Sequence, residues 1–130
     1  MNTVIRTVAV LAGGISHERD VSLRSGRRVA DSLKQQGIAV ELIDPDHNLF
    51  EKLSSGAFDV VWPVLHGAAG EDGTLSDLLE LMDIPSVGSL SSGARLAWDK
   101  PTAKALLSAQ GIHTPEAVTI SQETFRDYGA

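Results

Sequence analysis

The sequence predicts an α/β protein built on a Rossmann-like, doubly wound parallel sheet. Three observations predict this fold class. Short apolar runs rich in β-branched residues alternate with longer segments in which apolar residues recur at helical spacing. Glycines and prolines separate these segments, and hydrophobic residues make up 42% of the 130 residues, enough for a core. Strands that alternate with helices form a parallel sheet covered on both faces, with right-handed crossovers.

The first three predicted elements are a strand, a helix and a second strand. The apolar run from Val4 to Ala12 is too short for a typical helix and ends at Gly13-Gly14, which is typical of a buried strand. Helical periodicity predicts a helix from about Asp20 to Gln36, and Gly37 can end it in the left-handed conformation. Ile38 to Ile43 is the second strand.

The next elements continue the alternation. A short helix is expected from Asn48, where Asn48-x-x-Glu51 resembles a capping box and Leu49, Phe50 and Leu53 face inward. Asp59 to Leu65 is a third strand. Leucines at i, i+3 and i+4 then predict a helix from Leu75 to Met82, with Asp72 as its N-cap, and Pro85 to Gly88 is a short fourth strand.

The end of the chain differs from this pattern. A helix is expected from about Pro101 to Gln110, begun by Asp99 as its cap and ended by Gly111. Ala117 to Ile120 is strand-like, and a further helix starts near Ser121. We therefore expect two domains, residues 1–98 and the opening of a second domain at 99–130.

Charge and composition exclude several classes of protein. The chain has 11 Lys and Arg against 17 Asp and Glu, a formal net charge of −6. Binding to nucleic acid or to a membrane surface is therefore not expected, because both need basic patches. The absence of cysteine excludes disulfide scaffolds and cysteine-based zinc sites. We expect a soluble, cytoplasmic protein without a signal peptide or a membrane span.

Two irregular loops are the candidates for function, because ligands of open α/β sheets bind beyond the carboxyl ends of the strands. The first, Gly13 to Arg19, follows the first strand, and the second, His66 to Gly73, follows the third. The first loop has neither the glycine pattern of a dinucleotide fingerprint nor that of a P-loop. The histidines show no metal-ligand spacing, so no metal site is predicted.

The polar residues of these loops allow two interpretations each. Glu18 is either a surface carboxylate favoured by the dipole of the following helix or an anchor for a ligand ammonium. His66 is either a hydrogen-bonded histidine at a strand end or a functional group at the mouth of the sheet. Glu71 can orient it by accepting its ring hydrogen. Lys100, at a helix start, can reach a phosphate.

Two segments carry a resemblance to a known family. The segment from Val8 to Gly26 reads VAVLAGGISHERDVSLRSG, and the segment from Leu65 to Leu75 reads LHGAAGEDGTL. Together with Asp99-Lys100 and Gly111-Ile112-x-Thr114-Pro115, they resemble the N-terminal part of the D-alanine–D-alanine ligases, which are ATP-grasp enzymes. The resemblance covers essentially the whole chain, whereas the family is two to three times longer.

The resemblance implies a reaction and a set of roles. Such enzymes join two D-alanines for peptidoglycan synthesis: ATP phosphorylates the carboxylate of the first D-Ala, and the amine of the second displaces phosphate. It implies that Glu18 and His66 are catalytic, and that Glu18, Val21, Ser22, His66 and Glu71 bind substrate. It also implies that Lys100 contacts nucleotide phosphate, and that the Mg²⁺ ligands lie beyond Ala130.

The resemblance also implies a homodimer, and it implies that these 130 residues alone are inactive. Residues 1–98 would be the Rossmann-like substrate domain that precedes the ATP-grasp domain, and residues 99–130 the first elements of that domain. Two alternatives stay open. One is a related D-alanine–D-lactate or D-serine ligase, and the other is a stand-alone Rossmann-like binding module without catalysis.

Overall fold

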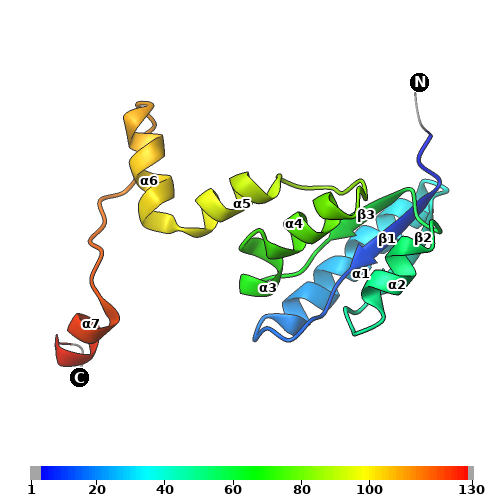
Figure 1. The fold of residues 1–130 in the computed structure, drawn as a ribbon, viewed down its shortest axis with the longest axis horizontal. Helices are drawn as coiled ribbons and strands as arrows, with labels where there is room; N and C mark the ends of the chain where they lie inside the picture. Colours follow the sequence, from blue (N-terminus) through cyan, green and yellow to red (C-terminus); the bar gives the residue numbers. More distant parts are fainter. Residues whose placement is uncertain (1–3, 129–130) are drawn as a thin grey trace. The chain divides into compact units, whose positions relative to one another are not determined.

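The computed structural model describes residues 4–128, which divide into two compact units, one up to Trp98 and one from Asp99 onward. The first unit holds a sheet of three parallel strands, β1 (Thr7–Leu11), β2 (Ala39–Ile43) and β3 (Val60–Pro63), in the order β2-β1-β3 (Figure 1). In the central strand, Val10 pairs with Leu42 on one side and with Trp62 on the other. This arrangement confirms the predicted α/β fold with a parallel sheet.

Helices cover both faces of the sheet, because successive side chains of β1 point to opposite faces. Helix α1 (Arg19–Gln35) covers one face, and α2 (Leu49–Ser54) and α4 (Thr74–Leu81) cover the other. The buried residues on the α1 side are Val8, Val10, Ala30 and Val60. Those on the other side are Ala9, Leu11, Ile43, Leu49, Leu53, Val61, Leu75 and Leu79. The sheet is therefore doubly wound, as predicted.

Helix α1 lies unusually close to the central strand. A Cβ atom built on Gly26 would lie only 2.4 Å from the Cβ of Ala12, so no other residue fits there without a shift of the helix. The helix ends as the sequence predicts, since Gly37 has a φ of +80° and the backbone N–H of Gly37 donates to the carbonyl of Lys34. Small residues thus set the distance between α1 and β1.

The predicted fourth strand at Pro85–Gly88 is wrong. Only Ser86 forms an isolated parallel bridge, with Val61, through hydrogen bonds that join Val61 to Pro85 and to Val87. Pro85 has no N–H to donate, and Gly88 has a φ of +141°, which turns the chain out of the extended conformation. The short run can therefore extend the sheet by one residue pair and no further.

Three predicted details of helix starts and faces are also corrected. Asn48 stands at the N-cap of α2 but makes no capping hydrogen bond with its side chain, so the capping box is absent. Phe50 is 41% exposed, although Leu49 and Leu53 are buried as expected. The N-cap of α4 is Gly73, and Asp72 instead accepts from the backbone N–H of Thr74 at 2.8 Å, forming a turn one residue earlier.

Two helices were not predicted, α3 (Ala68–Glu71) and α5 (Ser91–Trp98). Helix α5 is held against α4 by polar contacts rather than by an apolar stripe. Glu80 of α4 accepts from the backbone N–H of Ser91 at 2.7 Å, and Asp77 forms an ion pair with Arg95. A carboxylate from another helix thus satisfies the first turn of α5, which a local sequence pattern does not reveal.

The second unit contains α6 (Lys100–Ala109) and α7 (Gln122–Tyr128), joined by an extended segment. The start of α6 is as predicted, since Asp99 accepts from the backbone N–H of Thr102 at 2.8 Å. The hydroxyl of Thr102 and then its backbone N–H lower the pKa of the Asp99 carboxyl. The strand expected at 117–120 does not form, because the described residues offer that segment no partner strand.

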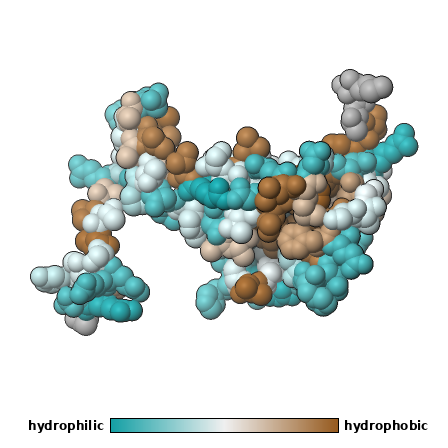
Figure 2. Space-filling view, in the orientation of Figure 1, coloured by the Kyte–Doolittle hydropathy of each residue, from teal (hydrophilic) through white to brown (hydrophobic). Residues whose placement is uncertain are grey.

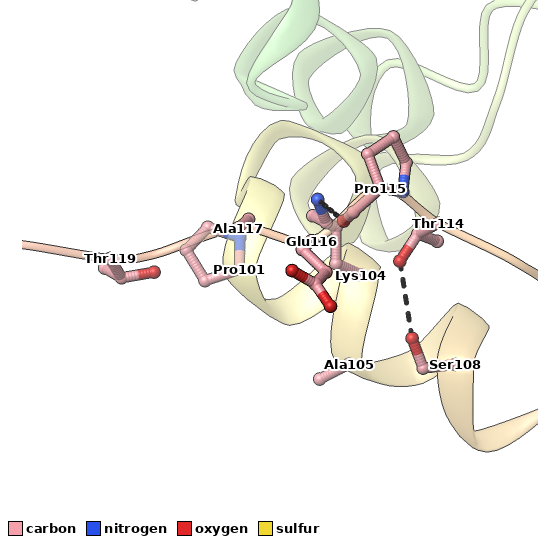
Figure 3. Close-up of a pocket in the computed structure, with 9 residues that line it drawn as sticks. All are labelled: Pro101, Lys104, Ala105, Ser108, Thr114, Pro115, Glu116, Ala117 and Thr119. Atoms are coloured by element: carbon pink, nitrogen blue, oxygen red, sulfur yellow. Dashed lines mark hydrogen bonds between the residues drawn. The ribbon is translucent and has the colours of Figure 1, made fainter.

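The extended segment packs beside α6 across a cavity of about 370 Å³ (Figure 3). Lys104 donates to the carbonyl of Pro115, and the hydroxyls of Ser108 and Thr114 lie 3.5 Å apart. Apolar side chains of this unit stay exposed on α6 and along the segment, including Leu106, Val118 and Ile120 (Figure 2). None of the helices within residues 4–128 is both long enough and apolar enough to span a bilayer.

At the end of the sheet opposite the candidate loops, the Asp59 carboxylate joins two strands by hydrogen bonds. Oδ2 of Asp59 accepts from the backbone N–H groups of Arg6 and Thr7, at 2.7 and 2.8 Å, and from the hydroxyl of Thr7 at 3.0 Å. These donors favour the charged carboxylate and lower the pKa of Asp59 below its ordinary value of 3.8. They join the start of β3 to the start of β1.

We expect Asp59→Asn to lower the free energy of unfolding at pH 7, because an amide oxygen is a weaker acceptor than a carboxylate. A pKa lowered by folding stabilises the folded chain above the unfolded pKa, near 3.8, and the stabilisation is lost as the pH falls through the folded pKa. The difference between the two chains should therefore vanish at strongly acidic pH. Urea unfolding from pH 7 to pH 2 measures it. Asp31→Asn, at an exposed position of α1, is the charge-matched control and should show no such pH-dependent loss.

A second prediction concerns Gly67, whose φ of +76° and ψ of −170° lie in a region that other residues essentially do not adopt. A Cβ there would also lie 3.3 Å from Ser16 of the first loop. Gly67→Ala should destabilise the fold by about 2–3 kcal/mol, within the range for strained backbone. Gly37→Ala is the matched control, because Gly37 also has a positive φ but a Cβ there meets nothing within 4 Å. Equal losses in urea unfolding would show that the two loops do not crowd each other at Gly67.

Candidate functional site

The two candidate loops meet at the carboxyl edge of the sheet. The first leaves β1 at Gly13-Gly14, and the second leaves β3 and passes through His66 and Gly67. A Cβ built on Gly67 would lie 3.3 Å from the hydroxyl of Ser16 and 3.6 Å from Oε2 of Glu18. Only a glycine thus allows the second loop to pass so close to the first. The fold brings the Glu18 carboxylate next to the segment that carries His66.

Glu18 occupies the N-cap position of α1, but its carboxylate does not cap the helix. Just before the helix, the hydroxyl of Ser16 accepts from the backbone N–H of Glu18 at 2.9 Å. The Glu18 side chain is exposed and takes part in none of the hydrogen bonds or ion pairs found among residues 4–128. An exposed carboxylate at the positive end of a helix, with its oxygens unused, can accept a cationic group.

The Glu71 carboxylate lies beside the His66 ring. Nδ1 of His66 lies 3.5 Å from Oε1 of Glu71, while Oε2 of Glu71 accepts from the backbone N–H of Gly67 at 3.0 Å. The single turn of α3 brings the Glu71 carboxylate back to the backbone N–H of Gly67, the residue that precedes the helix. A carboxylate only accepts, so the facing Nδ1 carries the hydrogen, and Nε2 of a neutral ring is then an acceptor.

Nε2 of His66 is buried and has no hydrogen-bond partner within residues 4–128. A buried polar atom without a partner costs free energy, about 1–3 kcal/mol. The His66 side chain as a whole is 31% exposed. The ring therefore lies at the surface, while Nε2 lacks a hydrogen-bond donor among the described residues. The geometry therefore favours a functional histidine over one whose hydrogen bonds are complete.

An ion pair fixes the glycine turn of the first loop. Asp44, which follows β2, pairs with Arg19 and accepts from the backbone N–H of Gly14 at 2.9 Å. Arg19 in turn donates to the carbonyl of Gly14 at 2.9 Å. The Arg19 hydrogen bond, followed by that of Gly14, lowers the pKa of Asp44, and the same pairing raises the pKa of Arg19. The sequence pattern assigns neither side chain a role in the site, although Arg19 ends the first candidate loop and Asp44 follows a strand at the same edge of the sheet.

Ser22 and Val21, both predicted to bind substrate, lie in very different environments. Val21 is 43% exposed on the first turn of α1. Ser22 is fully buried, and its hydroxyl accepts from the backbone N–H of Gly13 at 2.9 Å and donates to the carbonyl of Val64 at 2.6 Å. The hydroxyl hydrogen is used and the oxygen is sealed from solvent. The Ser22 side chain therefore has a structural position, not one that faces a ligand.

A small cavity of about 230 Å³ lies under the two loops. Its lining is mostly apolar and comes from the segments after all three strands. The lining residues are Gly13, Gly14, Ile15, Ser16, Pro45, Leu49, Leu65, His66, Ala69 and Leu75. His66 is the one ionisable side chain among these lining residues.

Lys100 belongs to the second unit, where it is the first residue of α6 and is exposed. A cation there follows directly after the Asp99 cap. In the part of the chain that the structure describes, no three His, Cys, Asp or Glu side chains gather closely enough to hold a metal ion.

Comparison with known proteins gives the same result from sequence and from structure. The family model "D-ala D-ala ligase N-terminus" matches residues 44–89. The D-alanine–D-alanine ligase of Carboxydothermus hydrogenoformans is 43% identical over 88% of this chain, and that of Nitrosomonas europaea is 42% identical over 98%. The aligned regions make up 36% and 42% of those two proteins, so the chain spans about two fifths of the length of the relatives it matches.

Solved structures agree. The D-alanine–D-alanine ligase from Bacillus anthracis complexed with ATP matches 96% of this chain and 43% of its own chain, with a TM-score of 0.76 and 27% identity. The VanG D-Ala:D-Ser ligase from Enterococcus faecalis matches 95% of this chain and 47% of its own, with a TM-score of 0.73 and 26% identity. In sequence and in fold, the chain is similar over nearly its whole length to the N-terminal portion of the D-alanine–D-alanine ligases.

Proposed function

We propose that this chain is the N-terminal part of an ATP-dependent D-alanine–D-alanine ligase, which supplies the dipeptide for peptidoglycan and hence cell-wall synthesis. One observation carries the proposal: the fold brings the Glu18 carboxylate beside Gly67, the residue that follows His66, at the carboxyl edge of the sheet, in a chain at least 42% identical to several ligases of that name. A stand-alone binding module leaves the unpartnered Nε2 of His66 without a purpose.

Glu18 is proposed to bind the ammonium group of the first D-alanine. Its carboxylate is exposed, free of the helix cap and close to Gly67 of the second loop. The partial positive charge of the α1 N-terminus and the neighbouring backbone N–H groups then favour the carboxylate end of the amino acid nearby. Val21, exposed on the same helix turn, is proposed to contact the apolar part of this substrate.

His66 is proposed to lie beside the reacting carboxylate, with Glu71 as the residue that orients it. Nδ1 lies 3.5 Å from Oε1 of Glu71, so we propose that the hydrogen of the neutral ring is on Nδ1 and that Nε2 meets a group on the substrate. When the ring is protonated, both nitrogens donate, and Glu71 stabilises that charge. In this role His66 would stabilise negative charge as the phosphoryl group moves to the substrate carboxylate.

ATP is the proposed second substrate, and Lys100 is proposed to contact its phosphates. Residues 99–130 would be the first elements of the central ATP-grasp domain, and residues 1–98 the substrate domain. The carboxylates that hold Mg²⁺ are proposed to lie beyond Ala130. In the reaction, the carboxylate of the first D-alanine takes the γ-phosphoryl group, and the amine of the second D-alanine attacks the acyl phosphate and releases phosphate. We further propose a cytoplasmic homodimer.

The identity of the second substrate is the main alternative. The match to a D-Ala:D-Ser ligase is nearly as good as those to D-alanine–D-alanine ligases, so the fold of this part does not select between them. The test is the complete protein that contains this chain, incubated with ATP, Mg²⁺ and D-alanine, D-alanine plus D-serine, or D-alanine plus D-lactate. Dipeptide and phosphate from D-alanine alone support the proposal. Product only with one of the other two acceptors would replace it.

We expect Glu18→Gln in that protein to raise the KM for the first D-alanine by about 10–100-fold, because a hydrogen bond to a charged partner contributes roughly 1.5–3 kcal/mol. The KM for ATP should stay nearly unchanged. Steady-state kinetics with each substrate varied in turn measures both. Asp20→Asn is the matched control, since Asp20 is another exposed carboxylate in the first turn of α1. Similar effects of both substitutions would mean that Glu18 acts only as a helix-end charge.

His66→Gln should instead lower kcat by about 10–100-fold, as expected when one charge-stabilising group is lost, with a smaller change in the first-site KM. His17→Gln, at an exposed histidine of the first loop, is the control and should leave kcat within about twofold of the wild type. The melting temperatures of both variants are compared alongside. A large loss of stability with unchanged kcat would assign His66 to the structure of the loop and not to the reaction.

A further inference from the structure

The buried hydroxyl of Ser22 joins the two loops of the candidate site. Its oxygen accepts from the backbone N–H of Gly13 at 2.9 Å, and its hydrogen goes to the carbonyl of Val64 at 2.6 Å. Gly13 begins the glycine turn of the first loop, and Val64 stands two residues before His66. One side chain thus contacts the ends of both strands from which the loops emerge.

The backbone of Ser22 adds a third connection. Its N–H donates to the carbonyl of Glu18 at 3.0 Å, the first hydrogen bond of α1. The same residue is therefore bonded to Glu18 through its main chain and to Gly13 and Val64 through its side chain. A shift of Ser22 would move the helix start, the glycine turn and the approach to His66 together.

Burial makes these hydrogen bonds matter. Ser22 is 0% exposed, in contrast to the Arg19–Asp44 pair, whose side chains are 45% and 42% exposed. Water can replace the partners of an exposed ion pair, but the Ser22 hydroxyl and its hydrogen bond with Gly13 are buried. Without the hydroxyl, the buried Gly13 N–H would lose its partner, and the half-buried Val64 carbonyl would lose its contact with α1.

We infer that Ser22 is a positioning residue, which fixes the distance between the Glu18 carboxylate and His66 without touching substrate. The inference rests on the proposed function of those two residues, and it replaces the substrate contact that the sequence resemblance implies for the Ser22 side chain. Misplacement of catalytic groups by about 1 Å can lower a rate by roughly 100-fold, so a structural hydroxyl at this point has a catalytic consequence.

The test is Ser22→Ala in the complete protein that contains this chain. We expect kcat/KM for D-alanine to fall by about 10–100-fold, with contributions from both kcat and the first-site KM, and the KM for ATP to stay within about twofold. The control is Ala30→Gly, a substitution at a buried position near the other end of α1 that weakens the same helix. It should lower the melting temperature while keeping kcat/KM within about twofold. Equal kinetic effects at equal stability loss would overturn the inference.

Amide hydrogen exchange on the same proteins gives a readout independent of activity. In Ser22→Ala, exchange at Gly13 and across residues 65–67 should rise together by about 10–100-fold. Exchange at Ala12, whose N–H donates to the carbonyl of Ile43, should not change. Unchanged exchange at Gly13 would also overturn the inference. A wild-type protein without D-alanine-dependent activity would instead refute the proposed function, and exchange would still decide whether Ser22 couples the loops.

If Ser22→Ala does not fold, Ser22→Cys replaces it, because a thiol keeps the shape of the side chain while its hydrogen bonds are weak. The same split between kcat/KM for D-alanine and the KM for ATP is expected, with a smaller loss. A cysteine variant as active as the wild type, with wild-type exchange at Gly13, would show that the hydrogen bonds of Ser22 do not set the geometry of the site.

Discussion

The structure depends on a single strand that is buried on both faces and paired on both edges. Residues Val8 to Ala12 are at most 1% exposed, and β1 pairs with both β2 and β3. The side chains of this strand belong to both apolar clusters, Val8 and Val10 to one and Ala9 and Leu11 to the other. Burial of each large side chain contributes roughly 1.5–3 kcal/mol. Both candidate loops are anchored to this strand, because the first leaves its end and the second leaves its neighbour.

Close packing around the strand end leaves little freedom in the loops. Gly26 brings α1 against Ala12, and the first turn of α1 then lies directly beyond the end of β1. The glycine turn must fit between that helix and Asp44, since a Cβ on Gly13 would lie 2.5 Å from Oδ1 of Asp44. Gly70 is restricted in the same way by the backbone of Leu65. The packing of these small residues therefore constrains the backbone on which Glu18 and His66 stand.

This explains which parts of the structure could be predicted from the sequence. Strands β1 to β3 and helices α1, α2, α4 and α6 have local signals, since an apolar period or a glycine stop identifies each of them. Helix α5 has none, because Glu80 of another helix satisfies its first turn. The strand expected at Pro85–Gly88 does not form for a related reason. A strand needs hydrogen bonds from successive backbone groups, and Pro85 has no N–H to donate. The loops could be identified as functional from their place at the strand ends, but the partners of Ser22 and Asp44 depend on the assembled sheet.

The polar residues at the carboxyl edge fall into two groups by how fully their hydrogen bonds are used. Ser22 and Asp44 have partners on the loop backbone, and these partners hold the loop shape. Asp59 has the corresponding role at the opposite edge. Glu18 and Nε2 of His66 lack such partners, although they lie in the same small region. Ser22 and Asp44 already satisfy the loop backbone. The Glu18 carboxylate and Nε2 of His66 therefore remain available for groups of a ligand. For the amino-acid substrate proposed above, the Glu18 carboxylate is opposite in charge to the ammonium group, and the His66 ring is complementary to the carboxylate in its protonated form, in which Nε2 donates. This complementarity supports the proposed function.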